Sequence, residues 1–112
     1  MIDINTVDDV YEVTFKNTQR LDVFLSETVK TKLLQLFEQP GTKILINMDG
    51  IHFLNSSGFA AFLALSKEAR NTGGRIIFCN VHESALKLFK VLQLHQSFTI
   101  IDNRDEALRS FK

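Results

Sequence analysis

The chain has 112 residues, and its 13 Lys and Arg residues balance 13 Asp and Glu residues, so its formal net charge is zero. This length predicts a single domain over residues 1–112, and 45% hydrophobic with 23% charged residues is the composition of a globular protein rather than a disordered one. A balanced charge leaves no basic surplus for binding nucleic acid and no polybasic anchor for anionic lipid.

The sequence also indicates where such a protein acts. No apolar run approaches the roughly 20 residues that span a bilayer, and residues 1–5 lack the basic and apolar regions of a secretory signal. Cys79 is the only cysteine, whereas small secreted domains usually have several. We therefore expect a cytoplasmic protein without direct membrane insertion. Composition alone does not separate small enzymes from switches and adaptors.

The chain begins with a predicted antiparallel hairpin. Ile2 and Ile4 alternate with polar neighbours, which predicts a short strand, and the β-branched and aromatic residues from Val10 to Lys16 predict a second. Asp8-Asp9 lies between them as a tight turn.

A helix and a buried strand are predicted next. From Leu21 to Phe37 apolar residues recur at helical spacing, and Asp22 is a good candidate for the N-cap because its carboxylate can accept first-turn amides. Pro40-Gly41 ends this helical region. The continuous apolar run within Lys43–Met48 is typical of a central strand that is buried on both faces.

Asp49-Gly50 allows two interpretations. Between apolar runs this dipeptide indicates a hairpin, with Ile51–Leu54 as the returning strand. Alternatively, Ile51–Leu54 is an extended lead-in to the following helix, which then makes the crossover to the next strand. The second interpretation is favoured, because it keeps strands and helices alternating.

Strands and helices continue to alternate to the end of the chain. The predicted elements are a helix over Ser57–Arg70 closed by Gly73-Gly74, a strand over Arg75–Cys79, a helix over Glu83–Leu94, a strand over Phe98–Ile101, and a last helix running through Leu108 to Phe111 that Asn103 and Glu106 cap. The order is β-β-α-β-α-β-α-β-α. It predicts an α/β fold with a mainly parallel sheet of about five strands and helices packed on it.

The side chains offer little for catalysis or for a metal. Cys79-x-x-His82 has the spacing of a ligand pair, but a zinc site needs a second pair that the sequence lacks. A buried strand cysteine and a surface-loop histidine are the favoured interpretation. Since glycine-rich phosphate loops and a nucleophile elbow are also absent from the sequence, we expect no catalytic residue, no metal and no cofactor.

Asn55-Ser56-Ser57-Gly58 is the segment with most potential for function. Asn and Ser are preferred N-cap residues, so these residues can simply start the predicted helix. Equally, a hydroxyl at a helix N-terminus is well placed to carry a phosphate, because free amides and the helix dipole favour negative charge there. Spacing alone favours the cap and leaves both interpretations open.

The segment from Ile44 to Gly58 resembles the signature of the STAS domain, the bacterial anti-sigma-factor antagonist family: a hydrophobic strand, a short turn, an apolar lead-in, then Asp-Ser-Ser/Thr-Gly opening a helix. The resemblance continues in Gly73–Ile77, in the segment from Val81 to Phe98, and in Glu106-Ala107-Leu108. Upstream, Leu21-Asp22 is similar to the residues that open the family's first long helix. The resemblance covers nearly the whole chain.

The resemblance implies roles for several residues. Ser56 falls on the family's phosphoacceptor, Asp22 on an acidic position near it, and Ser57 and Gly58 complete the turn into the helix. The implied partners are an anti-sigma factor that is also a serine kinase, which the unphosphorylated protein binds, and a serine phosphatase that resets the switch. The implied assembly is a monomer or a weak homodimer.

The chain departs from the family pattern at three places. Asn55 replaces the usual Asp, which keeps a cap but removes a negative charge beside the acceptor. Asn17–Arg20 lacks the Gly-Glu or Gly-Asp that usually precedes Leu-Asp. Phe59 and Phe62 replace a commoner Leu-Gly start of the helix. The favoured interpretation of each is a core residue. The alternative is that one of the two belongs to a partner surface.

A second function remains open at the level of the sequence. The chain is also similar to STAS modules that are not phosphorylated, such as the small subunit of a lipid-transport ABC complex. In that case the same face would dock on an ATPase subunit, or belong to another signalling assembly, and Ser56 would be only a cap. An enzyme has little support.

Overall fold

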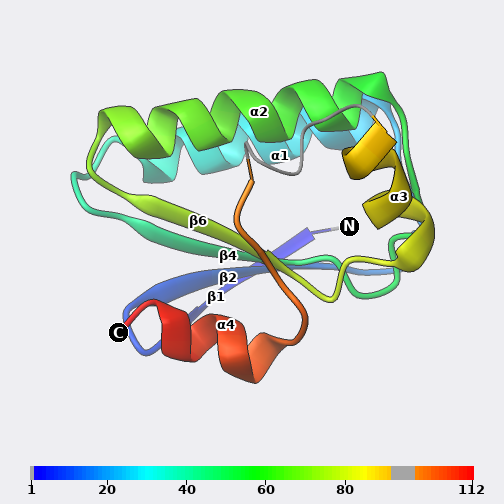
Figure 1. Cartoon of the computed structure of the whole chain (residues 1–112). Coiled ribbons are helices and arrows are strands. Elements are labelled where there is room, and N and C mark those ends of the chain that lie inside the picture. The colour runs from blue at the N-terminus through cyan, green and yellow to red at the C-terminus, as the bar shows by residue number, and fades with distance from the viewer. Residues whose placement is uncertain (1, 92–97) are drawn as a thin grey trace.

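The computed structural model describes residues 2–91 and 98–112 and shows a three-layer α/β arrangement (Figure 1). The elements, in chain order, are β1 Ile2–Val7, β2 Val10–Phe15, β3 Arg20–Leu21, α1 Val23–Leu36, β4 Lys43–Asn47, β5 Phe53–Leu54, α2 Ser56–Asn71, β6 Arg75–Cys79, α3 Glu83–Val91, β7 Ile100–Ile101 and α4 Arg104–Ser110.

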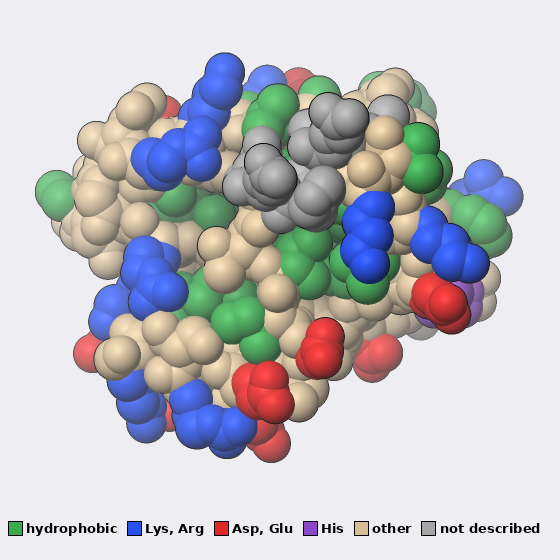
Figure 2. Space-filling model, viewed as in Figure 1, with side chains coloured by type: hydrophobic (Ala, Val, Ile, Leu, Met, Phe, Trp, Pro, Cys, Tyr) green, Lys and Arg blue, Asp and Glu red, His purple; other side chains and the backbone are tan. Residues whose placement is uncertain are grey.

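A five-stranded sheet in the order β1-β2-β4-β6-β7 forms the middle layer. β1 runs antiparallel to β2, and the other neighbouring pairs are parallel. α1 and α2 lie side by side over one face, and α4 covers the other (Figure 1). The predicted α/β fold with a mainly parallel sheet of about five strands is confirmed. On the face in Figure 2 both signs of charge are present, in keeping with the zero net charge.

Local signals in the sequence placed the turns and caps correctly. Asp8 and Asp9 both have positive φ, 50° and 68°, which is the backbone of a type I′ hairpin turn. The Asp22 carboxylate accepts a hydrogen bond from the Leu25 amide at 2.8 Å, and so caps α1. The Asn103 side chain accepts from the Glu106 amide at 2.9 Å, and so caps α4.

Asp49-Gly50 does not turn a hairpin. Instead, Phe53–Leu54 pairs in parallel with Arg20–Leu21, which forms a second, two-stranded sheet that the sequence analysis missed. The lead-in interpretation of Ile51–Leu54 is therefore the correct one. Leu21 was predicted at the start of a helix but belongs to β3, so that α1 begins two residues later.

The other boundaries differ from the predictions by a few residues. α2 begins at Ser56 rather than Ser57, and β7 is limited to Ile100–Ile101. The predicted end of the third helix, Leu92 to Leu94, lies outside the described residues. Within 2–91 and 98–112, none of the helices has both the length and the apolar character that crossing a bilayer requires.

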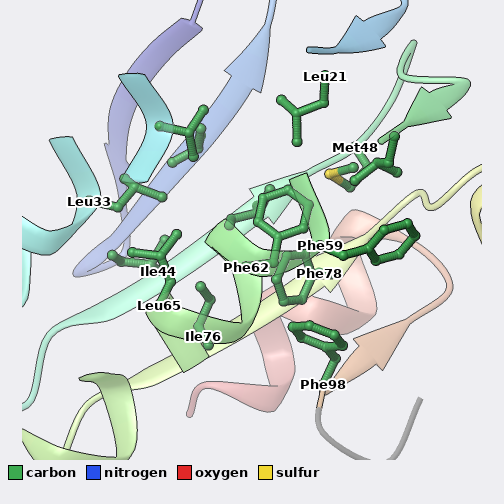
Figure 3. Packing of buried hydrophobic residues seen from close by; sticks show 14 of the residues in the cluster. Leu21, Leu33, Ile44, Met48, Phe59, Phe62, Leu65, Ile76, Phe78 and Phe98 are labelled. Atoms are coloured by element: carbon green, nitrogen blue, oxygen red, sulfur yellow. The ribbon is translucent and has the colours of Figure 1, made fainter. Parts of the chain in front are cut away.

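The core on the α1–α2 side is rich in aromatic residues (Figure 3). Phe78 of β6 lies edge-on to Phe62 of α2, with ring centroids 4.8 Å apart, and to Phe98 at 5.3 Å. Such tilted pairs are the favoured geometry of aromatic packing. A smaller cluster, including Leu45, Ile77 and Phe111, fills the space between the sheet and α4.

An ion pair between the partly exposed Arg104 and the buried carboxylate of Glu12 joins α4 to the sheet. The Arg104 guanidinium donates to both carboxylate oxygens of Glu12, with distances of 2.7 Å and 2.9 Å. Asn47 also donates to Glu12 and accepts a hydrogen bond from Asn80, so β2, β4 and the end of β6 share one polar network. Glu12 is only 6% exposed, and these partners compensate for its burial.

Candidate functional site

Ser56 is the first residue of α2 and is exposed. Asn55 before it has extended backbone angles and is the N-cap, and its side-chain oxygen accepts a hydrogen bond from the Gly58 amide at 3.1 Å. The neutral Asn therefore performs the capping that the family's Asp would provide. The Ser56 hydroxyl lies at the positive end of a 16-residue helix dipole.

The short β3–β5 sheet brings a second helix start beside the first. Leu21 pairs with Leu54, and each strand leads directly into a capped helix. Asp22 caps α1 and Asn55 caps α2, so the two caps lie next to each other at one end of the molecule. Both line a shallow hollow of about 260 Å³ together with Arg20 and Phe53.

Gly58 allows α2 to approach this small sheet closely. A Cβ at this position would lie 2.9 Å from Leu21 Cδ2 and 3.1 Å from Leu54 Cδ2, closer than carbon atoms pack. Both leucines are buried, so the glycine sets how near the helix start lies to β3 and β5. Gly58 has a packing role, and Ser57 beside it is half-buried.

Phe59 does not reach the surface. Only 6% of it is exposed, and its ring lies edge-on to Phe89 of α3 with centroids 4.8 Å apart. Phe62 is fully buried. The interpretation of both residues as core is confirmed, and Phe59 has to be removed from the predicted partner surface because its burial leaves no ring face for another protein.

The exposed apolar side chains at this end of the molecule are not Phe59 and Phe62 but three residues that the sequence analysis did not select. Phe24 is 84% exposed, Val23 53% and Phe53 51%. The Arg20 guanidinium lies 4.9 Å from the centre of the Phe53 ring, a cation–π distance. We call Val23, Phe24 and Phe53 the apolar patch. One signal was available in the sequence: Phe24 lies outside the stripe of α1 formed by Leu25, Val29 and Leu33.

The candidate metal pair does not assemble. Cys79 is fully buried in β6, and burial, followed by the nearby negative charge of Glu12, raises the pKa of its thiol to about 12. His82 instead stacks on His52, with ring centroids 4.2 Å apart, and shares a hydrogen bond with Ser84. Among the residues that the structure describes, no three His, Cys, Asp or Glu side chains are grouped as a metal ion would need.

The family model for the STAS domain matches residues 1–107. The chain therefore belongs to the STAS domain family, as its motifs suggested. Solved structures agree on the fold: an anti-sigma-factor antagonist (STAS) domain protein from Planctomyces limnophilus has a TM-score of 0.87 and 20% identity, with 99% of this chain and 97% of that one covered.

Two further relatives are described by function. The phosphorylated form of SpoIIAA, a cell fate determinant from Bacillus, has a TM-score of 0.76 and 21% identity, with both chains fully covered. BtrV of Bordetella bronchiseptica, a candidate anti-sigma factor antagonist, is 17% identical over 87 residues, which is 78% of this chain and 75% of that protein.

Proposed function

We propose that this protein is an anti-sigma-factor antagonist, a binding module whose attachment to an anti-sigma factor is switched by phosphorylation of Ser56. The observation that carries the proposal is an exposed serine at the start of α2, three residues after the exposed Phe53, on a strand that pairs with the one leading into α1, where Val23 and Phe24 are exposed. Membership of the STAS family and likeness to proteins described as anti-sigma factor antagonists support it.

The apolar patch supplies the surface for a partner. Large apolar side chains that are mostly exposed mark protein-binding sites when they gather. Phe53 precedes Ser56 by three residues, and Phe24 follows the Asp22 cap on the neighbouring helix. A partner covering Phe24 and Phe53 would also cover Ser56 and the two caps.

Phosphorylation would act at the interface and leave the fold intact. A phosphate adds about −1.5 to −2 charge at neutral pH. At a helix N-terminus it is tolerated or stabilises by about 0.3–1 kcal/mol. Burying that charge unpaired against a partner costs several kcal/mol, and about 1.4 kcal/mol already lowers affinity tenfold. Asn55 keeps the cap without placing a fixed negative charge next to the phosphate.

The proposed cycle uses two enzymes and takes place in the cytoplasm. The anti-sigma factor, acting as a serine kinase, transfers the terminal phosphoryl group of ATP to Ser56 Oγ, which releases ADP and the hydroxyl proton. A serine phosphatase hydrolyses the ester and returns the free hydroxyl and inorganic phosphate. This chain contributes the acceptor and the docking surface.

The test begins with proteins from the native host. The partner co-purifying with this chain is identified by mass spectrometry, purified, and incubated with the chain and ATP. We expect the intact mass to increase by one phosphate, the increase to vanish in Ser56→Ala, and the half-buried neighbour variant Ser57→Ala to be phosphorylated normally.

Binding measurements then test the switch itself. Ser56→Ala and Ser56→Asp should have the same melting temperature, while the Asp variant loses at least tenfold in affinity for the anti-sigma factor. Equal affinity of the two variants would contradict the switch. Co-purification with a transporter ATPase subunit, and no phosphate on Ser56, would instead favour the adaptor function.

A further inference from the structure

The two edges of the five-stranded sheet differ in the length of backbone that they present. At one edge β7 has only two residues, and a very short edge strand offers few backbone groups to another chain. At the opposite edge β1 has six residues and is the last strand of the sheet (Figure 1). Among residues 2–91 and 98–112, β2 is the only strand that pairs with β1. The outer side of β1 is therefore available to a further strand.

The turn after β1 determines which backbone groups point outward. It is a two-residue type I′ turn, so its flanking residues Val7 and Val10 form a hydrogen-bonded pair. Hydrogen-bonded and non-hydrogen-bonded pairs alternate along an antiparallel ladder. Every second residue back from Val7 therefore bonds to β2, and the amides and carbonyls of the residues between them point away from the sheet. These outward-facing residues are Ile2, Ile4 and Thr6.

β1 has few of the features by which natural proteins block an edge strand. Proline, a bulge or an unpaired charge discourages pairing with another chain. β1 contains no proline, and its six residues pair with β2 without a bulge. Its one charged residue, Asp3, is neutralised, because a carboxylate oxygen lies 2.6 Å from Lys16 Nζ. Neither the backbone nor the charge of β1 therefore opposes another strand.

The sequence of β1 is complementary to itself in the antiparallel direction. With a two-fold axis at Ile4, the Ile4 residues of two copies form a central hydrogen-bonded pair, and Ile2 of each copy lies opposite Thr6 of the other. All the outward-facing residues are then paired. Between them Asp3 lies opposite Asn5, so like charges do not face each other directly. We propose that two copies of this chain associate through β1 and join their five-stranded sheets into one continuous sheet.

Apolar side chains add to this backbone pairing. Ile2 and Ile4 are only partly buried and pack against the core between the sheet and helices α1 and α2. Opposite residues of an antiparallel pair lie on the same face of the sheet, so the two Ile4 side chains would contact each other across the axis. Because this axis is perpendicular to the sheet, α1 and α2 of both copies lie on one face and α4 on the other.

The size of the contact limits its strength. A single pair of short strands buries less surface than the roughly 1,200–2,000 Å² of a stable protein interface. We therefore expect a weak homodimer, with a Kd of about 0.1–1 mM. The association does not depend on the function proposed for Ser56, since β1 shares no residue with the motif or with the apolar patch.

The first test follows the full-length, isotopically labelled protein from concentrations well below the expected Kd to concentrations above it. Analytical ultracentrifugation should show the mass rising from one chain towards two. The amide resonances of Ile4 and Thr6 should shift saturably over the same range, because their N–H groups gain acceptors. A chain that stays monomeric throughout overturns the proposal, and so do shifts centred on Phe24 and Phe53, which would indicate a dimer through the apolar patch.

Charge substitutions at Asn5 test the register. Asn5 is exposed and would face Asp3 of the second copy, and symmetry applies each substitution twice. Asn5→Lys should lower the dimer Kd at least twofold and Asn5→Asp should raise it at least twofold, since opposite charges stabilise cross-strand pairs and like charges destabilise them. The matched controls are Asn71→Lys and Asn71→Asp at the exposed end of α2, which should leave the Kd unchanged. Effects of the same sign from both Asn5 variants, or equal effects from the controls, overturn the pairing.

A proline at position 6 tests the backbone bonds. Proline is tolerated in an edge strand where the N–H faces solvent, so Thr6→Pro should remain folded at low concentration by circular dichroism but lose the dimer. Thr6→Val keeps the amide and should dimerise at least as tightly as the original chain. A folded Thr6→Pro variant with the original Kd contradicts the proposal. If Thr6→Pro does not fold, the opposite effects of the two Asn5 variants decide.

Discussion

Phe24 and Leu25 are neighbours on the first turn of α1, yet Phe24 is 84% exposed and Leu25 7%. Leu25 belongs to the stripe that faces the core, and Phe24 is turned about 100° away from it on the helix. An exposed Phe ring gains nothing for the stability of the isolated domain. Phe24 lies two residues after the Asp22 cap, so a partner that covered this end of the molecule would bury the ring.

This gives a prediction at the residue scale. Phe24→Ser should change the free energy of unfolding by no more than about 0.5 kcal/mol, because surface substitutions away from packed features have small effects. It should lower the affinity for the anti-sigma factor at least tenfold, as loss of an aromatic anchor does. Urea unfolding and calorimetric titration with the purified partner measure the two quantities.

The control for Phe24 is Val91→Ser. Val91 is also exposed, to 75%, but it lies at the end of α3 and is not part of the apolar patch. Its substitution should leave affinity unchanged. If Val91→Ser weakened binding as much as Phe24→Ser, the loss would report general surface hydrophobicity and the apolar patch would not be the docking site.

Individual residues differed in how well the sequence predicted them. Asp22 and Asn55 were assigned as caps from local patterns, because a cap depends on only four or five consecutive residues. Phe53 and Phe24 were missed and Phe59 was misplaced, because an aromatic residue in sequence does not show which side of its element the core occupies. That depends on where the helices pack.

At the scale of elements, the turn between β1 and β2 was predicted from the sequence, although its backbone conformation is unfavourable for most residues. Asp8 and Asp9 adopt left-handed backbone angles, which non-glycine residues rarely adopt and which Asp tolerates better than most. The turn joins six paired positions of β1 and β2, from Ile2 with Phe15 to Val7 with Val10. A residue that resists positive φ would act against this entire pairing.

We therefore predict opposite effects of two substitutions at one position. Asp9→Val should destabilise the protein by about 1–3 kcal/mol, since a β-branched residue at positive φ is strained, whereas Asp9→Gly should keep or slightly raise stability. Thermal and urea unfolding provide the comparison. Asn5→Val, in the extended part of the same hairpin, is the control and should not destabilise; if it did so as much as Asp9→Val, strain at the turn would not be the cause.

The two-residue strands could not have been predicted in the same way. β3 and β5 are too short to show a period of two, and they exist because Leu21 and Leu54 meet beneath Gly58 in the folded chain. The longer elements gave clear signals, since each has several turns or a continuous apolar run. Their order alone was enough to predict the parallel sheet and to favour the lead-in over the hairpin.

At the scale of the whole molecule, the zero net charge means that a single phosphate would set the sign of the total charge. With 13 cationic and 13 anionic side chains, one phosphate on Ser56 would move the protein from neutral to about −2. The fold keeps that change local, because Ser56 is exposed at one end of α2. The charges that hold the molecule together are elsewhere, in the ion pair between Glu12 of β2 and Arg104 of α4.

The Glu12–Arg104 pair gives a prediction about pH. The hydrogen bonds from Arg104 outweigh the effect of burial and lower the pKa of Glu12 below its ordinary 4.5. A lowered pKa in the folded state means that the stabilisation is fully present above pH 4.5 and is lost as the pH falls through the folded pKa. Glu12→Gln should therefore cost about 1.5–3 kcal/mol near neutral pH, the range for hydrogen bonds to charged groups.

The same substitution should cost progressively less in acid, because the protonated Glu12 of the original protein then resembles Gln in charge. Urea unfolding of both proteins at several pH values measures the difference. Glu38→Gln, at an exposed position after α1, is the control and should give only a small difference in the free energy of unfolding. A cost of Glu12→Gln that stayed constant from neutral pH to well below pH 4.5 would show that shape, and not the charge of the pair, joins α4 to the sheet.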